Sequence, residues 1–229
     1  MVAIIIPTYN EDALIEKTLH NLTLDLKLDY RIIIVDDGSS DNTVTIIKRF
    51  AQSRSNITII SNKIHRGYSE VLKQGFEAVK EGEVLVTLMA DGCDDVTILK
   101  DMYHQIYHGA DIVCASRYIK GGKRIGGSRI KACGSWFVNR LVSSLKKIPC
   151  HDLTNSFKMV KKEVLNSIDI ESVAFEFFLE LILKAYIRGF TIVEIPTVWK
   201  ERQEGRSKFQ LYRNGIRYWK WIYYGFRHI

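Results

Sequence analysis

The chain has 229 residues, of which 46% are hydrophobic and 26% are charged, with a formal net charge of +7. These values are typical of one soluble globular domain, with or without a short appendage. No apolar run approaches the ~20 residues that a membrane-spanning helix needs. The short apolar start MVAIII also lacks the charged first part of a signal peptide. We therefore expect a soluble or peripheral protein. The basic excess suits an anionic membrane or phosphorylated substrates, because it is concentrated after Lys120.

The four cysteines are widely scattered and form no CxxC pair. This pattern argues against a zinc site and against a disulfide framework. It favours the reducing cytosol as the location of the protein.

Short apolar runs alternate with stretches of helical periodicity along the first half of the chain. The apolar runs predict buried strands at Val2–Ile6, Arg31–Val35, Ile57–Ile60, Val84–Leu88 and Asp111–Ala115. The periodic stretches predict helices at Glu11–Leu22, from Ser40 or Asp41 through Phe50, at Gly67–Lys80 and over about 96–108. Parallel strands need such crossover helices. We therefore expect an α/β domain with a mostly parallel sheet and helices on both faces.

Acidic loops follow three of the predicted strands. They contain Glu11, the pair Asp36-Asp37, and the group Asp91, Asp94 and Asp95. In an open parallel sheet, ligands bind beyond the carboxyl ends of the strands. Carboxylates there suit a divalent cation held together with substrate phosphates. The last loop taken alone could equally be a polar turn before an acidic helix start. No glycine-rich phosphate loop follows any strand, so side chains and a metal would hold a nucleotide.

The order and spacing of several motifs carry a resemblance to a known family. PTYNE from Pro7, VDDGSSDNT from Val35 and the Asp91 loop resemble the family 2 glycosyltransferases, which have the Rossmann-like GT-A fold. SRYIKGG from Ser116, HDLTNSFKMVKKEVL from His151 and ERQEGRSKF from Glu201 resemble the polyprenol-phosphate glycosyltransferases, the dolichol-phosphate mannosyltransferases above all. The resemblance covers Val2 to Phe209.

This resemblance implies the inverting transfer of a hexose from a nucleotide-sugar to a polyprenol or dolichol phosphate. The choice of mannose as the sugar and GDP-mannose as the donor rests on the resemblance alone. The sequence leaves open UDP-glucose as donor, a glycan instead of a lipid as acceptor, or a donor-binding protein that has lost catalysis. A nucleic acid is not expected as a partner, because the basic residues form no known nucleic-acid motif.

The resemblance also implies roles for individual residues. The donor would contact Pro7, Tyr9, Glu11, Asp36, Asp37, Ala90, Arg202 and Lys208. The acceptor phosphate would contact Arg117, Arg129, Lys131 and Ser135. Asp91, Arg117 and Arg202 would serve the transfer itself, and Asp91 would bind Mg²⁺ or Mn²⁺. Arginines suit this role because they make charge-assisted, forked hydrogen bonds to phosphates.

Two positions depart from the family pattern at the metal loop. Met89 stands where the family has the first Asp of an Asp-x-Asp motif, and Cys93 stands where it has a glutamine. A thioether is a poor ligand for a hard cation. Asp94 and Asp95 are the candidate replacements, directly or through water. The alternative is weakened metal binding or loss of catalysis.

The C-terminal stretch suggests contact with a membrane surface. We expect a transferase domain over 1–208 and a separate helix over 209–229. In that helix one face is aromatic and apolar and another is basic, as an interfacial amphipathic helix requires. The alternative is a terminal helix packed on its own domain. The first hypothesis predicts a peripheral protein on the cytoplasmic face of a membrane, bound directly or through a membrane partner subunit. The same helix would also be expected in a truncated form of a membrane-anchored protein.

Overall fold

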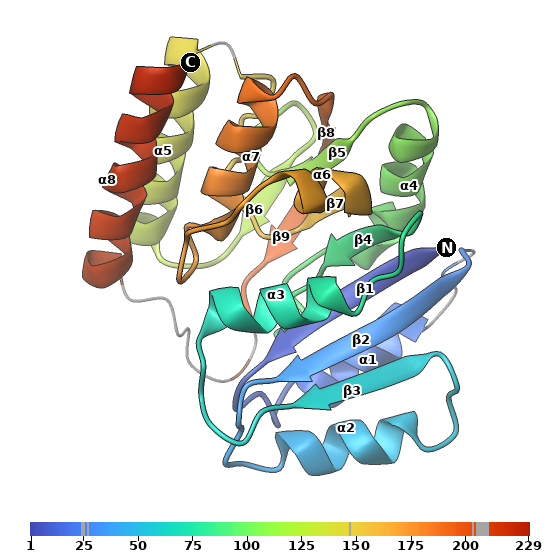
Figure 1. Ribbon diagram of the computed structural model, residues 1–229. Helices are drawn as coiled ribbons and strands as arrows, with labels where there is room; N and C mark the ends of the chain where they lie inside the picture. The colour runs from blue at the N-terminus through green and yellow to red at the C-terminus, as the bar shows by residue number, and fades with distance from the viewer. Residues whose placement is uncertain (24–25, 27, 147, 203, 205–210) are drawn as a thin grey trace.

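The computed structural model describes residues 1–23, 26, 28–146, 148–202, 204 and 211–229. At its centre is a seven-stranded sheet with the order β3-β2-β1-β4-β7-β5-β8 (Figure 1). These strands are β1 (Val2–Thr8), β2 (Tyr30–Asp36), β3 (Ile57–Ser61), β4 (Val84–Thr87), β5 (Ile112–Ser116), β7 (Lys158–Lys161) and β8 (Ile192–Pro196). All neighbours pair in parallel except β7, which is antiparallel to β4 and to β5. The prediction of a mostly parallel sheet is confirmed.

Helices cover both faces of this sheet, as predicted. One face packs against α1 (Ile15–Thr23), α2 (Thr43–Ala51) and α4 (Leu99–Tyr107), and the other packs against α3 (Tyr68–Glu77), α6 (Lys162–Ser167) and α7 (Phe177–Ile187). Successive side chains of a strand point to opposite faces. In β1, accordingly, Ile4 and Ile6 enter one hydrophobic cluster while Ile5 enters the other. Both faces of the central strands are therefore buried, which explains their continuous apolar runs.

Two element boundaries differ from the prediction. The first helix begins at Ile15 instead of Glu11, and residues 12–14 form a turn that leads into it. The amide of Glu11 donates to Thr43 Oγ1 in the neighbouring loop at 2.8 Å, and the carbonyl of Glu11 accepts from the amide of Ile15 at 2.9 Å. The helix predicted over 96–108 divides into a short 3₁₀ turn, η1 (Val96–Ile98), and α4. Asp95 caps that turn, since its carboxylate accepts from the amide of Thr97 at 3.1 Å.

A second layer is built from the late part of the chain. A two-stranded parallel sheet pairs β6 (Lys123–Ile125) with β9 (Val198–Lys200). The long helices α5 (Arg129–Lys146) and α8 (Leu211–His228) lie side by side at one end of the molecule, next to α7 (Figure 1). From α8, the side chains of Tyr218, Trp221 and Ile222 are buried in the core.

The same two helices also carry large apolar side chains that are exposed. These are Ile130, Trp136 and Phe137 on α5 and Ile216, Trp219, Tyr223 and Phe226 on α8. The C-terminal helix thus packs on its own domain and still exposes Ile216, Trp219, Tyr223 and Phe226. In the part of the chain that the structure describes, no helix combines the length and the hydrophobicity that crossing a bilayer requires.

Candidate active site

The loops after β1 and β2 form one connected edge. The amide of Asn10 donates to Ser39 Oγ at 2.9 Å, and the amide of Ser40 donates to Asn10 Oδ1 at 2.8 Å. Asn10 adopts a positive φ of 49°, a conformation that asparagine tolerates better than most residues. Parallel pairing aligns the ends of these strands, so their loops meet as the sequence predicted.

The two aspartates after β2 are buried and shape the loops around them. Asp36 accepts two amide hydrogen bonds from its own turn, at 3.1 and 3.2 Å. Asp37 accepts two from the loop before α3, at 2.7 and 2.9 Å. Beside them, the ring of Tyr9 stacks on His65 with centroids 4.3 Å apart. Pro7, at the end of β1, pairs with Val35. Their predicted contact with the donor stays a prediction.

Arg202 joins two of the predicted acidic loops. Its Nη2 lies 2.7 Å from Asp91 Oδ2, and its Nη1 lies 3.5 Å from Glu11 Oε2. Burial opposes the charged form, but the carboxylates of Asp91 and Glu11 raise the pKa of Arg202 above its usual value. The late loop therefore reaches the strand ends, as the prediction for Arg202 requires. Lys208 lies outside the described residues.

Of the three aspartates in the metal loop, only Asp91 lines the cavity, where it is paired with Arg202. Asp91 stands at the end of β4, whereas Asp95 is engaged as the cap of η1. Asp94 accepts the amide of Met89 at 3.1 Å, and burial together with the nearby Asp91 charge raises the pKa of Asp94 to about 7. The Met89 sulfur accepts from Tyr68 Oη at 3.7 Å, so it is already engaged within the chain.

Within the described residues, no three His, Cys, Asp or Glu side chains are grouped to hold a metal ion. The donor set nevertheless fits Mg²⁺ or Mn²⁺ bound mainly by substrate. Such ions are commonly held by one or two carboxylates together with substrate phosphates and water. Asp91 would be the protein ligand. Ala90 is buried, and its carbonyl accepts from Thr18 Oγ1 at 2.8 Å, which fixes the start of this loop.

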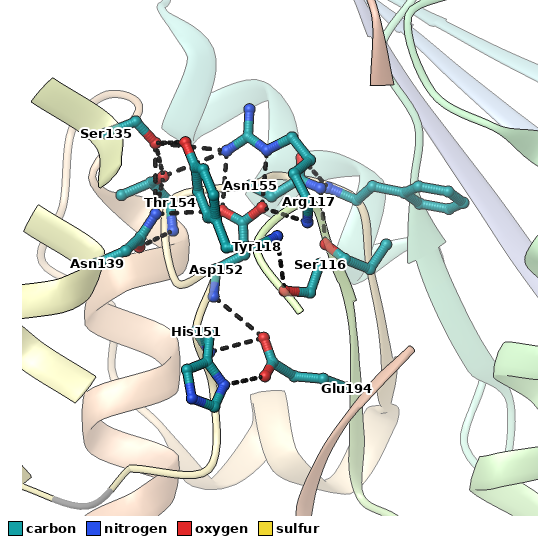
Figure 2. A network of polar contacts seen from close by, with 12 residues as sticks. Ser116, Arg117, Tyr118, Ser135, Asn139, His151, Asp152, Thr154, Asn155 and Glu194 are labelled. Carbon is teal, nitrogen blue, oxygen red and sulfur yellow. Dashed lines mark hydrogen bonds and ion pairs between the residues drawn. The ribbon is translucent and has the colours of Figure 1, made fainter. Parts of the chain in front are cut away.

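Arg117 is the centre of a second polar group (Figure 2). It follows β5, and Asp152 holds it through three hydrogen bonds: Nε to Oδ2 at 2.7 Å, Nη2 to Oδ1 at 2.8 Å, and the amide to Oδ2 at 3.0 Å. Burial alone would lower the pKa of Arg117, but the Asp152 charge outweighs it and raises that pKa. Asp152 itself is fully buried.

Hydroxyl and amide groups continue this network. Ser135 Oγ lies 2.8 Å from Thr154 Oγ1 and accepts from Tyr118 Oη at 3.2 Å. Asn139 donates to Thr154 and to Asp152, at 3.1 and 3.3 Å (Figure 2). Sequence reasoning did not assign a role to these partners of Arg117 and Ser135. The HDLTNS run at 151–156 contains Asp152 and Thr154, and the SRYIKGG run contains Tyr118, whereas no motif pointed to Asn139.

A cavity of about 420 Å³ joins the two groups. Its lining includes five residues that the sequence predicted for the site, namely Asp91, Arg117, Lys131, Ser135 and Arg202. Its apolar side is formed by Phe137 and Val138 of α5 and by Tyr218, Trp219 and Ile222 of α8. Arg129, predicted for the acceptor phosphate, is exposed at the start of α5 and is not part of this lining.

The arrangement is that of a transferase of the GT-A class: an acidic strand edge, a late loop that returns to it, and a cationic pocket alongside. The family model for glycosyl transferase family 2 matches residues 3–169, and the chain belongs to this family.

Individual relatives support the same assignment. A dolichol-phosphate mannosyltransferase of Pyrococcus furiosus is 29% identical over 96% of this chain, which spans 64% of that relative's length. A polyprenol monophosphomannose synthase of Mycolicibacterium smegmatis is 30% identical over 90% of this chain and 79% of its own. Among solved structures, the glucosyl-3-phosphoglycerate synthase of Mycobacterium tuberculosis with Mn²⁺ and UDP has a TM-score of 0.69. That match is 17% identical and covers 97% of this chain and 77% of the other. It confirms the fold.

Proposed function

We propose that this chain transfers a hexose from a nucleotide-sugar to a polyprenyl phosphate, with inversion at the anomeric carbon. The observation that carries the proposal is the cavity between Asp91 and Arg117. It brings a donor-side carboxylate, a cationic phosphate pocket and an apolar groove together in one space. The polyprenol-phosphate relatives support this acceptor class. They also favour GDP-mannose as the donor, with UDP-glucose as the competing choice.

The chemistry needs positioning more than proton transfer. A phosphate monoester has a second pKa near 6, so at neutral pH it is already an anionic nucleophile and needs no general base. The protein must hold two anions in line against their repulsion. Arg117 would bind the acceptor phosphate, and Ser135 would donate its hydroxyl hydrogen to it.

At the donor end, charge develops on the departing nucleoside diphosphate. A bound Mg²⁺ or Mn²⁺ at Asp91 would neutralise part of that charge. Arg202 lies 2.7 Å from the same carboxylate, and its guanidinium would contact the diphosphate as well. The carboxylates of Asp91 and Glu11 thus hold Arg202 ready at the donor site.

The acceptor class implies a membrane surface. Exposed Trp219 and Tyr223 on α8, with Trp136 and Phe137 on α5, lie on the two helices that line the apolar side of the cavity. Aromatic side chains are suited to the headgroup region of a bilayer. We propose that these helices rest on the cytoplasmic face of a membrane, with or without a membrane partner subunit, and that the lipid enters the cavity between them.

The transfer assay uses a short polyprenyl phosphate and radiolabelled GDP-mannose or UDP-glucose, each with Mn²⁺, Mg²⁺ or EDTA. We expect labelled lipid with one donor, abolished by Asp91→Ala and retained by Asp101→Ala, a matched change on the exposed side of α4. Donor binding without transfer to lipid would point to another acceptor or to a protein that has lost catalysis. The presence of Met89 in place of the family's aspartate favours the second explanation. Full activity in EDTA would refute the metal role of Asp91.

Membrane contact is tested separately by sedimentation with vesicles of phosphatidylcholine and phosphatidylglycerol. We expect Tyr223→Ser with Phe226→Ser to weaken binding several-fold, because each exposed aromatic ring adds buried apolar area at the interface. Tyr107→Ser, an exposed aromatic on α4, is the matched control. Equal binding by all three proteins would contradict this orientation.

A further inference from the structure

The cavity contains a guanidinium that the predicted phosphate-binding set does not include. Arg124 lies on β6, and its guanidinium carbon is 4.4 Å from the centre of the Trp199 ring on β9. Its Nε also donates to the carbonyl of Gly126 at 3.3 Å. Both Arg124 and Trp199 line the cavity. The pairing of β6 with β9 aligns these two residues directly, so the small sheet fixes the position of this cation.

The backbone of the next glycine also limits where this guanidinium lies. Gly127 has a φ of +86°, and a side chain at this position would clash with Arg124 Nη2 unless the guanidinium moved. The amide of Gly127 donates to Glu201 Oε2 at 2.6 Å, which holds this loop against the end of β9. The Arg124 guanidinium therefore lies between the Trp199 ring and the backbone of Gly127.

Arg117 has little hydrogen-bonding capacity left for a ligand. Its Nε and Nη2 are directed to Asp152, Ser135 and Thr154. Within the described part of the chain only Nη1 has no partner, and Figure 2 shows this terminal nitrogen without a dashed line. Asp152 also compensates much of its charge. The two N–H groups of Nη1 cannot by themselves neutralise a phosphate that carries two negative charges.

Arg124 supplies what Arg117 lacks. Among the described residues, no carboxylate forms an ion pair with its guanidinium, and the carboxylate of Glu201, which also acts on Arg124, accepts from the amide of Gly127. Burial and the positive charge of Arg117 both lower the pKa of Arg124, so the two guanidinium groups repel each other across the cavity. An anion placed between them would relieve that repulsion.

We propose that Arg124, supported by Trp199, is a second guanidinium that binds the phosphate of the acceptor opposite Arg117. The inference rests on the proposed function for the identity of the phosphate carrier, and it assigns to Arg124 the contact that the sequence assigned to Arg129. Two guanidinium groups suit a phosphate monoester, which is a dianion above pH 6, better than a phosphodiester, which carries one charge.

The test measures binding of farnesyl phosphate by calorimetry without any donor. A charge-assisted hydrogen bond in such a site corresponds to about 10- to 100-fold in affinity, so Arg124→Ala should weaken binding by that factor. Lys123→Ala removes the same charge from the neighbouring, exposed residue outside the cavity lining, and it should leave the affinity unchanged. In Gly127→Ala the charge of Arg124 remains but its guanidinium is displaced, so we expect the affinity for farnesyl phosphate to fall in this variant too.

A second probe separates a specific contact from general electrostatics. Wild-type protein should prefer farnesyl phosphate to its monomethyl ester, and Arg124→Ala should lose most of that preference. In the transfer assay, Arg124→Ala should raise the KM for the acceptor and leave the KM for the donor unchanged. Thermal unfolding of each variant establishes that the chain is folded.

The outcomes distinguish this inference from the proposed function. Binding of farnesyl phosphate that depends on Arg124, without any sugar transfer, would support the inference while the proposed function fails. Equal affinity in wild type and Arg124→Ala, or an equal loss in Lys123→Ala, would overturn the inference even if transfer occurs. Failure of the wild-type protein to bind farnesyl phosphate would overturn both.

Discussion

The ion pair between Arg117 and Asp152 allows a sharp prediction about stability. The Arg117 side chain is 9% exposed and the Asp152 side chain is 0% exposed, and their closest atoms lie 2.7 Å apart. Removing one partner of a buried pair leaves an uncompensated charge, which typically costs 3–5 kcal/mol. Asp152→Ala also leaves the Arg117 amide without the carboxylate to which it donates. We therefore expect the free energy of unfolding to fall by about 4 kcal/mol.

Urea unfolding followed by tryptophan fluorescence measures this change, with the denaturant slope as a check that the transition stays cooperative. The matched control is Glu16→Ala, which breaks a pair with Arg49 whose side chains are 46% and 63% exposed. That change should cost under about 1 kcal/mol.

The double variant Arg117→Met with Asp152→Ala tests the reasoning itself. Removing both charges abolishes the desolvation penalty that the single variant leaves behind, so the double variant should be more stable than Asp152→Ala. The single variant Arg117→Met completes the comparison. If the stability losses of Arg117→Met and Asp152→Ala simply add in the double variant, the buried charge is not the cause of the destabilisation.

Three further predictions concern other parts of the fold. Because burial raises the pKa of Asp94 to about 7 from 3.8, the unfolded chain binds fewer protons between those values, and the free energy of unfolding falls with rising pH by up to about 1.4 kcal/mol per unit. Asp94→Asn should remove this slope when urea unfolding is measured from pH 4 to 7. If the free energy of unfolding changes with pH equally in wild type and Asp94→Asn, the prediction is wrong. Gly75→Ala places a Cβ 2.6 Å from Ile5 Cγ2, and this overpacking should lower stability by about 1–3 kcal/mol in the same assay. Met89→Asp adds an oxygen ligand beside Asp91, so calorimetry with Mn²⁺ and a nucleoside diphosphate should show several-fold tighter binding; an unchanged Kd would place the metal elsewhere.

The central sheet was predictable because its signal is local. A buried strand needs apolar side chains on both faces, and a run such as Val2–Ile6 displays that need in consecutive residues. The crossover helices show their buried faces with similar clarity, for example through Ile15, Leu19 and Leu22 in α1. The positions of Glu11, Asp36 and Asp91 at strand ends followed directly, because parallel strands align their carboxyl ends.

The late part of the sheet was not predicted. β7 is four residues long and inserts antiparallel between β4 and β5, and β6 and β9 have three residues each. Such short segments show no periodicity, and their pairing is set by packing against the rest of the domain. The same holds for the turn before Ile15, where the amide of Glu11 donates to Thr43 in the neighbouring loop.

The sequence alone determined the fold class and the acidic strand edge, and it predicted cationic residues for a phosphate site. The tertiary structure decided which of those cations meet in the cavity: Arg124 lines it and Arg129 does not. It also supplied the partners, since Asp152 lies 35 residues from the arginine that it holds. The physical reason is that burial of a helix or strand requires apolar residues at regular positions along the chain. Contacts between distant side chains depend on how the segments pack, and no local pattern records them.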